Sequence, residues 1–286
     1  MSIFVTIFAN KYQTKQTDNM TTFKRFFAVA ALVALAAVSA DAQKLAITAH
    51  RGNWNCEEGG GARNSIAALK AAQDNGYWGS EFDVQMTKDF KLIVHHDAAV
   101  KGVSIWNNDW STFSKARLEN GEPIPTLDEY LTQGEKSSCV LVCELKSQKT
   151  TAHELYMTDL VVNSFKGHNL LDPKRVIFIS FSLDICKRLA LLCPGFTVQY
   201  LGGDIAPDVL KTYGINGIDY HYSVFAKHPE WFDMARENGM SINCWTCNRE
   251  EDIEAMIELG VDCITTDEPQ RVRRLMRKSR ERRQGK

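Results

Sequence analysis

Two carboxylates in this chain are spaced so that they crowd one another. Glu81 and Asp83 flank Phe82 in an apolar segment that predicts a β-strand, and side chains two positions apart on a strand point to the same face. Two carboxylates held about 4 Å apart repel by roughly 4 kcal/mol at an effective dielectric constant of about 20. A bound cation or a shared proton offsets this cost, so the spacing indicates a metal-assisted enzyme.

A third carboxylate follows a run of four apolar residues. Glu144 ends the predicted strand and Lys146 follows it on the same face. A buried carboxylate requires a partner, and taken alone this pair predicts an ordinary ion pair. Because Glu81 and Asp83 converge as well, we interpret Glu144 as a third oxygen ligand. Three carboxylates favour a single hard divalent cation, Mg²⁺ or Ca²⁺, over zinc, and the sequence does not choose between these two ions.

Two histidines stand beside the predicted strand ends. His50 follows one apolar run, and of the adjacent His95 and His96, strand alternation selects His96 for the interior. A single histidine is more often structural, but two beside a cation suit general acid–base work near neutral pH. Arg51 adds a fixed, forked donor for an anion. With Lys146 and the cation, this set of side chains suits the hydrolysis of a phosphate ester.

The elements that would position these residues repeat along the chain. From residue 44 onward short apolar runs alternate with helix-period segments, which is typical of strand–helix units in a parallel sheet. About eight such units favour a closed α/β TIM barrel, (β/α)8, over an open sheet, and such barrels place active sites at the carboxyl ends of their strands. Residues 101–122 break the repeat and predict a small insertion after the third strand, beside the mouth of the site. The predicted strands are 46–49, 79–84, 92–95, 140–144, 176–180, 197–201, 217–220, 241–246 and 263–265, and the most clearly marked helices are 65–75, 127–133 and 250–259.

The ends of the chain differ in charge from its body. The net charge of −1 conceals +8 over residues 271–286 and +2 over residues 1–42, which leaves −11 for residues 43–270. A nucleic-acid-binding protein would carry basic residues over its folded face, so the acidic body argues against nucleic acid as a partner. The basic tail is interpreted as a solvated helix end, and contact with anionic lipid or phosphate is the alternative.

The N-terminal segment has the parts of an export signal. From Met20, the suspected initiator, a basic start precedes the apolar run 26–38 and then small residues, which predicts a signal peptide cleaved after Ala42. The apolar run is short for a bilayer span, and the alternative is an uncleaved anchor. We therefore expect a leader and signal peptide (1–42), a catalytic domain (43–270) and a basic tail (271–286). The mature protein is expected to be periplasmic or secreted, with no stable membrane span.

All eight cysteines lie in the part of the chain that is expected to be exported, where disulfides can form. Cys244 and Cys247 form a Cys-x-x-Cys pattern, but the predicted strand places three residues over about 10 Å. That is beyond the roughly 7 Å between α-carbons that a disulfide tolerates. We therefore expect most of the cysteines to be buried as small apolar side chains.

Short motifs recur in order over essentially all of residues 46–271. They read Ala49-His50-Arg51-Gly52, Asn64-Ser65, Glu81-Phe82-Asp83-Val84, Val94-His95-His96-Asp97, Pro125-Thr126-Leu127, Glu144-Leu145-Lys146, Ser180-Phe181, Trp245-Thr246 and Thr265-Thr266-Asp267-Glu268-Pro269. No single motif is decisive, but the ordered series resembles the glycerophosphodiester phosphodiesterase family.

The resemblance implies a TIM-barrel hydrolase that splits glycerophosphodiesters into sn-glycerol 3-phosphate and an alcohol. It also implies that the glycerol hydroxyl next to the ester acts as an internal nucleophile. The implied roles are cation binding by Glu81, Asp83 and Glu144, acid–base catalysis by His50 and His96, phosphate contact by Arg51 and Lys146, and contact with the glycerol end by Trp245.

One departure from the family pattern and two rival functions remain open. Arg63 stands where the family usually has a glutamate, and it either shifts the site toward more anionic substrates or points to solvent. A related barrel phosphodiesterase acting on lysophospholipid or sphingolipid headgroups would share the same carboxylates and histidines, with Trp106 and Trp110 sheltering an acyl chain. A protein that binds glycerophosphodiesters without cleaving them is disfavoured, because binding requires no histidine pair.

Overall fold

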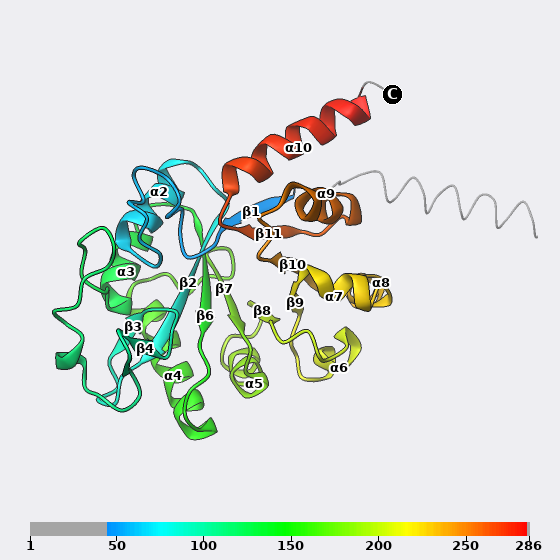
Figure 1. Cartoon of the computed structure of the whole chain (residues 1–286). Coiled ribbons are helices and arrows are strands. Elements are labelled where there is room, and N and C mark those ends of the chain that lie inside the picture. Colours follow the sequence, from blue (N-terminus) through cyan, green and yellow to red (C-terminus); the bar gives the residue numbers. More distant parts are fainter. Residues whose placement is uncertain (1–44, 285–286) are drawn as a thin grey trace, which may run out of the picture. The chain divides into compact units, whose positions relative to one another are not determined.

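Eight parallel strands close into a barrel in the computed structural model, which describes residues 45–284 and the side chains of residues 45–282 (Figure 1). Neighbours in the sheet follow the order β1, β11, β10, β9, β8, β7, β6 and β2, and pairing of β1 with β2 completes the circle. The prediction of a TIM barrel is confirmed. The strands are β1 (Ala46–Ala49), β2 (Gly79–Met86), β6 (Val140–Leu145), β7 (Val176–Ser180), β8 (Thr197–Tyr200), β9 (Gly217–His221), β10 (Ser241–Trp245) and β11 (Cys263–Thr266).

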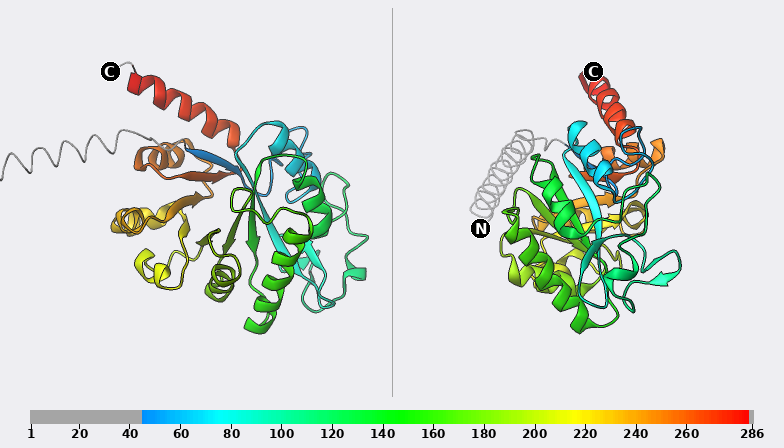
Figure 2. Two further views of the ribbon diagram at one scale, coloured as in Figure 1. Left: turned by 180° about the vertical axis from the view of Figure 1, so that it is seen from behind. Right: turned by 90° about the vertical axis from the view of Figure 1, so that its left-hand side faces the viewer.

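Helices follow the strands and lie around the outside of the barrel (Figure 2). Local signals set their ends: Ser65 caps α2, Thr126 and Glu129 form a capping box on α3, and α9 stops at Gly260 with φ of 85°, which are the terminal signals that helices commonly use. The predicted helices at 65–75, 127–133 and 250–259 are confirmed to within a residue or so. The helices are α2 (Ile66–Asp74), α3 (Leu127–Gly134), α4 (Thr151–Gly167), α5 (Leu183–Leu192), α6 (Pro207–Thr212), α7 (Tyr222–Lys227), α8 (Glu230–Glu237), α9 (Glu250–Leu259) and α10 (Pro269–Gln284).

Strand β2 is longer than its neighbours and buried along all eight residues. Its first part pairs with β1 and β6, while its last three residues pair with β3 (Leu92–Val94), which runs antiparallel. The predicted strand 92–95 therefore exists but lies outside the barrel circle. It leads into the insertion, which begins earlier than the predicted residues 101–122 because its hairpin consists of β4 (Ala99–Val100) and β5 (Val103–Ser104). The short 3-10 helix η1 (Trp110–Thr112) follows within the predicted range.

The insertion is stabilised by a small core of its own. Ile105 and Phe113 are buried in it, and Trp106 and Trp110 pack partly buried against the same cluster. The Trp106 indole also donates a hydrogen bond to Gln85 on β2 at 3.2 Å. Trp106 thus ties the insertion to β2 and Trp110 packs within the core of the insertion, which gives no support to the idea that they shelter an acyl chain.

The basic C-terminal segment makes up most of α10, which projects from the barrel (Figures 1 and 2). Val272 and Leu275 are buried at its base, whereas Arg277 and Arg280 are exposed further along. This is the arrangement of a solvated helix end. Over residues 45–284 no helix is long and apolar enough to cross a membrane, and the predicted signal peptide at 1–42 lies outside the described residues.

The cysteines are unbonded, and all except the half-buried Cys56 are buried. The prediction that most are small core residues is confirmed. The prediction that Cys244 and Cys247 lie too far apart was wrong for their side chains, because their sulfur atoms are 3.5 Å apart. Strand β10 ends at Trp245, so the chain leaves the extended conformation before Cys247 and the two thiols meet in the core.

Candidate active site

Three buried carboxylates meet at one end of the barrel. Asp83 on β2 and Glu144 on β6 are direct partners in the strand register, and neighbouring strands lie about 4.8 Å apart. Glu81 precedes Asp83 by two residues and so faces the same side. One oxygen from each of the three lies within 4.8 Å of the others, and the side chains are buried. The predicted convergence of Glu81, Asp83 and Glu144 is therefore present.

Cations of the protein balance this acidic cluster only in part. The Lys146 ammonium lies 2.6 Å from Glu144 Oε1 and 3.3 Å from Asp83 Oδ1, and Arg51 Nε lies 3.6 Å from Asp83 Oδ2. Glu81 accepts the Arg51 backbone N–H at 2.8 Å through Oε2, while its buried Oε1 has no hydrogen-bond partner among residues 45–282. Three carboxylates against two cations leave a negative, oxygen-lined site with an unused acceptor, which fits a hard divalent cation.

The pKa values of the three carboxyl groups reflect their burial and the excess of negative charge. Burial, reinforced by Asp83 and Glu144, raises the pKa of Glu81 well above its ordinary value. Burial and the Asp83 charge raise the pKa of Glu144 to about 8. Burial acts on Asp83 in the same direction, but Lys146 and the other positive groups outweigh it and lower the pKa of Asp83. Without a metal ion, burial and mutual repulsion therefore favour the protonated forms of Glu81 and Glu144 over their charged forms.

Metal binding is expected to raise the melting temperature more at about pH 8.5 than at about pH 5.5. Raised pKa values mean that the metal-free fold binds protons that the unfolded chain releases above about 4.5. The stability they contribute is present at low pH and is lost as the pH rises toward 8, where a divalent ion replaces the protons. Thermal melts with EDTA, Mg²⁺ and Ca²⁺ at both pH values measure this. A rise that is equal at the two pH values would contradict a cation held by this cluster.

His50 is oriented by a residue from the far end of the chain. Its Nδ1 lies 2.9 Å from Asp267 Oδ1, and Asp267 also accepts hydrogen bonds from the Trp54 indole at 3.0 Å and from Asn248 at 2.7 Å. Burial tends to raise the pKa of Asp267, but these partners, His50 first, lower it to about 2. His50 Nε2 lies 4.0 Å from Glu81 Oε2. The carboxylate therefore holds one ring nitrogen and leaves the other facing the acidic cluster.

Arg51 lies in a tight turn after β1 in which two successive residues have positive φ angles. Its φ of 56° is followed by a φ of 80° at Gly52, where an added Cβ would meet the Ala68 Cβ at 2.6 Å. A non-glycine residue at positive φ costs free energy and persists only where its surroundings hold it. The backbone bond from Arg51 to Glu81 supplies this support and places the Arg51 guanidinium beside Asp83.

His96 lies closer to solvent than His50. Strand β3 ends at Val94, so the two following histidines diverge: His95 Nε2 lies 3.3 Å from the Ala99 carbonyl, whereas His96 Nδ1 lies 2.7 Å from Asp97. Burial lowers the pKa of His96, and the negative charge of Asp83 opposes this shift. His96 thus lies within the field of the acidic cluster, and its ring remains 37 % exposed.

Aromatic side chains gather where strands β7, β9 and β10 end. The Trp245 indole donates to the Asp219 carbonyl at 2.9 Å and meets the rings of Phe181 and His221 edge-on, with centroids 5.6 and 5.3 Å away. The Lys146 ammonium lies 5.9 Å from the Phe181 ring, which connects this wall to the carboxylates. Trp245 therefore lies at the carboxyl end of β10 among other aromatic side chains, and its contact with the glycerol end stays a prediction.

Several residues of the site were not assigned roles from the sequence. Asp267 and Asn64 belong to the ordered motifs without a predicted role, and Asn64 donates a hydrogen bond to Asp83 Oδ2 at 2.8 Å. Phe181 and His221 each stand at or just after a strand end, and that position was the available signal. The signal is weak, because a polar or aromatic residue at a strand end does not by itself indicate a role in chemistry.

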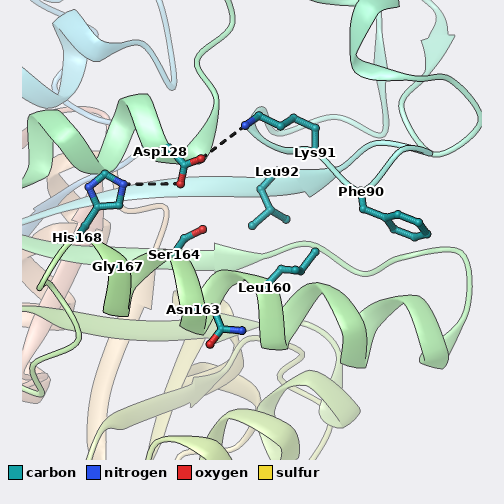
Figure 3. A pocket seen from close by; sticks show the side chains of 9 residues that line it. All are labelled: Phe90, Lys91, Leu92, Asp128, Leu160, Asn163, Ser164, Gly167 and His168. Atoms are coloured by element: carbon teal, nitrogen blue, oxygen red, sulfur yellow. Dashed lines mark ion pairs between the residues drawn. The ribbon is translucent and has the colours of Figure 1, made fainter.

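A second hollow in the molecule is separate from this site. It has a volume of about 500 Å³ and is lined by residues from β3, α3 and α4. Figure 3 shows Lys91 and His168 pointing to Asp128 across it, at 3.5 and 3.6 Å. None of the predicted catalytic or metal-binding residues lines this hollow.

Known proteins match the chain over almost all of its described length. The model of the glycerophosphoryl diester phosphodiesterase family matches residues 50–271. A glycerophosphodiester phosphodiesterase of Caldanaerobacter subterraneus subsp. tengcongensis is 31% identical over 253 residues, which is 82% of this chain and 99% of that protein.

Solved structures give the same result. The crystal structure of a glycerophosphodiester phosphodiesterase from Parabacteroides distasonis superposes with a TM-score of 0.80 at 39% identity, covering 83% of this chain and 98% of that one. A phosphodiesterase of Oleispira antarctica, solved in complex with the product sn-glycerol-3-phosphate, shares the fold with a TM-score of 0.68 at 21% identity, over 81% of this chain and 96% of that one. With its closed eight-stranded barrel and its ordered motifs, the chain belongs to the glycerophosphoryl diester phosphodiesterase family of hydrolases.

Proposed function

We propose that this protein hydrolyses glycerophosphodiesters to sn-glycerol 3-phosphate and an alcohol, using one divalent cation, Mg²⁺ or Ca²⁺. The observation that carries the proposal is the buried cluster of Glu81, Asp83 and Glu144 with a histidine oriented toward it. The Oleispira relative, which holds sn-glycerol-3-phosphate as its product, supports the choice of product. When bound by the three carboxylates, the cation supplies charge neutralisation at the phosphate.

The remaining charges of the site suit a phosphodiester. Arg51 and Lys146 carry positive charge beside the carboxylates and would bind the phosphate oxygens, because a guanidinium fork and an ammonium complement them. Trp245, in the aromatic wall, would contact the glycerol end. Together these contacts would orient the P–O bond that is broken with its leaving oxygen toward a proton donor.

Proton transfer is assigned to the two histidines. One removes the proton from the attacking hydroxyl, which by resemblance to the family is the glycerol hydroxyl next to the ester, and the other protonates the oxygen of the leaving alcohol. This attack forms a P–O bond to the glycerol hydroxyl and breaks the P–O bond to the alcohol, which would leave a cyclic phosphate. Water then attacks the phosphorus, the new P–O bond breaks and the glycerol hydroxyl regains its proton, so that the net reaction consumes one water molecule. On His50 the proton moves at Nε2, because Nδ1 is held by Asp267.

We further propose that the protein acts after export, in the periplasm or outside the cell. The basis is the predicted signal peptide at 1–42 and the organisation into leader, catalytic domain and basic tail. Edman or mass-spectrometric determination of the mature N-terminus tests this, with Gln43 as the expected first residue.

The activity is tested by a screen for metal-dependent release of sn-glycerol 3-phosphate. Glycerophosphocholine, glycerophosphoethanolamine and glycerophosphoglycerol are expected to be cleaved with Mg²⁺ or Ca²⁺ and not with EDTA. A lysophospholipid and a sphingolipid with the same headgroup serve as comparisons. Cleavage of the lipid forms alone would favour the related lipid phosphodiesterase, and tight binding of glycerophosphocholine without release of product would indicate a binding protein.

A further inference from the structure

The exposed Arg63 side chain packs on an aromatic ring near the site. Its guanidinium carbon lies 4.0 Å above the centre of the Trp54 ring, which is an attractive cation–π contact. Within residues 45–282 Arg63 makes no ion pair with a carboxylate. A guanidinium that makes no ion pair keeps N–H donors available for an anion.

Contacts on both sides connect Arg63 to the residues of the active site. The indole on which it stacks donates to Asp267, which holds the Nδ1 of His50. The residue after it, Asn64, donates to Asp83 at 2.8 Å. Arg63 therefore lies at the rim of the site. It is next to Asn64, which supports Asp83, and it packs on Trp54, which contacts Asp267.

Hydrogen bonds hold the backbone on both sides of Arg63. Asn64 has a φ of 61° and its N–H donates to the Arg51 carbonyl at 2.9 Å. On the other side, the buried Ala62 accepts a hydrogen bond from the Ser65 hydroxyl at 2.7 Å. A donor that is already held in place loses little conformational entropy when a ligand binds. Arg63 is thus a preorganised cation at the rim. The single negative charge of a phosphodiester would face Arg51 and Lys146, so Arg63 is left free to bind a second anion.

We propose that Arg63 is a specificity-determining residue that favours glycerophosphodiesters whose alcohol half carries a second anionic group, a phosphate or a carboxylate. The inference rests on the proposed function of the site. Arg51, Lys146 and the carboxylate cluster deal with the scissile phosphate, and Arg63 binds the second anion at the rim. A purely structural role, in which Arg63 only covers Trp54, would affect all substrates alike.

The experiment compares three diesters that differ in the charge of the alcohol. Bis(glycerophospho)glycerol carries a second phosphate, glycerophosphoglycerol a neutral alcohol and glycerophosphocholine a cationic one. In Arg63→Gln the ratio of kcat/KM for the doubly charged to the neutral diester is expected to fall about tenfold, since a hydrogen bond to a charged group is lost. Arg63→Glu is expected to lower the ratio further and to raise that of the cationic to the neutral diester. The wild-type preference is expected to weaken with added salt.

The control is Arg117→Gln, an exposed arginine in the insertion whose guanidinium contacts only a neighbouring carbonyl among the described residues. Its ratios are expected to equal those of the wild type. Equal losses for all three diesters in Arg63→Gln, or unchanged ratios, would overturn the specificity role while leaving the proposed function intact. A wild-type protein that cleaves none of the three diesters with either metal would overturn both.

Discussion

Substitution of His50 or His96 by glutamine is expected to lower kcat for glycerophosphodiesters about 100- to 10,000-fold. Glutamine keeps a polar side chain of similar reach but cannot exchange a proton near neutral pH. The effect of His50→Gln should be on turnover, because Asp267 holds Nδ1 and only Nε2 faces the carboxylates. Initial rates at saturating metal, with titration of the metal by the rise in melting temperature, separate the chemical step from metal binding.

The matched control for the histidines is His168→Gln. His168 lines the second hollow, away from the candidate site, and contacts the carboxylates of Glu135 and Asp128. Its replacement is expected to leave kcat within about twofold of wild type. A His96→Gln variant that kept more than about a tenth of wild-type turnover would exclude His96 from proton transfer. Its direct partner, Asp97, would then account for its orientation as a surface ion pair.

Replacement of Glu81 by glutamine is expected to change activity and stability in opposite directions. The kcat/KM is expected to fall about 100- to 1,000-fold, because the cation loses a charged ligand and with it the electrostatic stabilisation of the transition state. The metal-free variant, however, is expected to melt at a higher temperature than the metal-free wild type at about pH 8.5, since a buried and repelled charge is removed. Its pKa, raised first by burial and then by Asp83, is the basis for that sign.

The control for Glu81 is Glu154→Gln, another buried carboxylate. Glu154 accepts hydrogen bonds from the Ser182 hydroxyl at 2.7 Å and from the Gln148 N–H at 3.2 Å, so its charge is satisfied locally. This variant is expected to lose stability and to keep its metal-dependent activity. If Glu81→Gln retained activity and still gained melting temperature with metal, the three carboxylates would not be the cation site.

Part of the active site could be predicted because it depends on local geometry. The period of a strand places Glu81 and Asp83 on one face wherever that strand lies, and the apolar alternation with helix caps at Ser65, Thr126 and Gly260 marks the repeating units. Eight units of this kind leave a closed barrel as the favoured arrangement. For these features short-range stereochemistry and burial are sufficient causes.

The rest of the active site depends on which segments of the chain meet in space. Only the tertiary structure decides this. The register of β2 against β6 sets Asp83 beside Glu144, and closure of the barrel brings Asp267 to His50 across 217 positions of sequence. The same applies to the thiols of Cys244 and Cys247, which meet because β10 ends between them. Pairing and strand ends are set by the packing of the whole barrel, in which a shift of one residue would turn every side chain of a strand to the opposite face. No local sequence pattern determines strand pairing and register, whereas the sequence alone determines which chemical groups are available to meet.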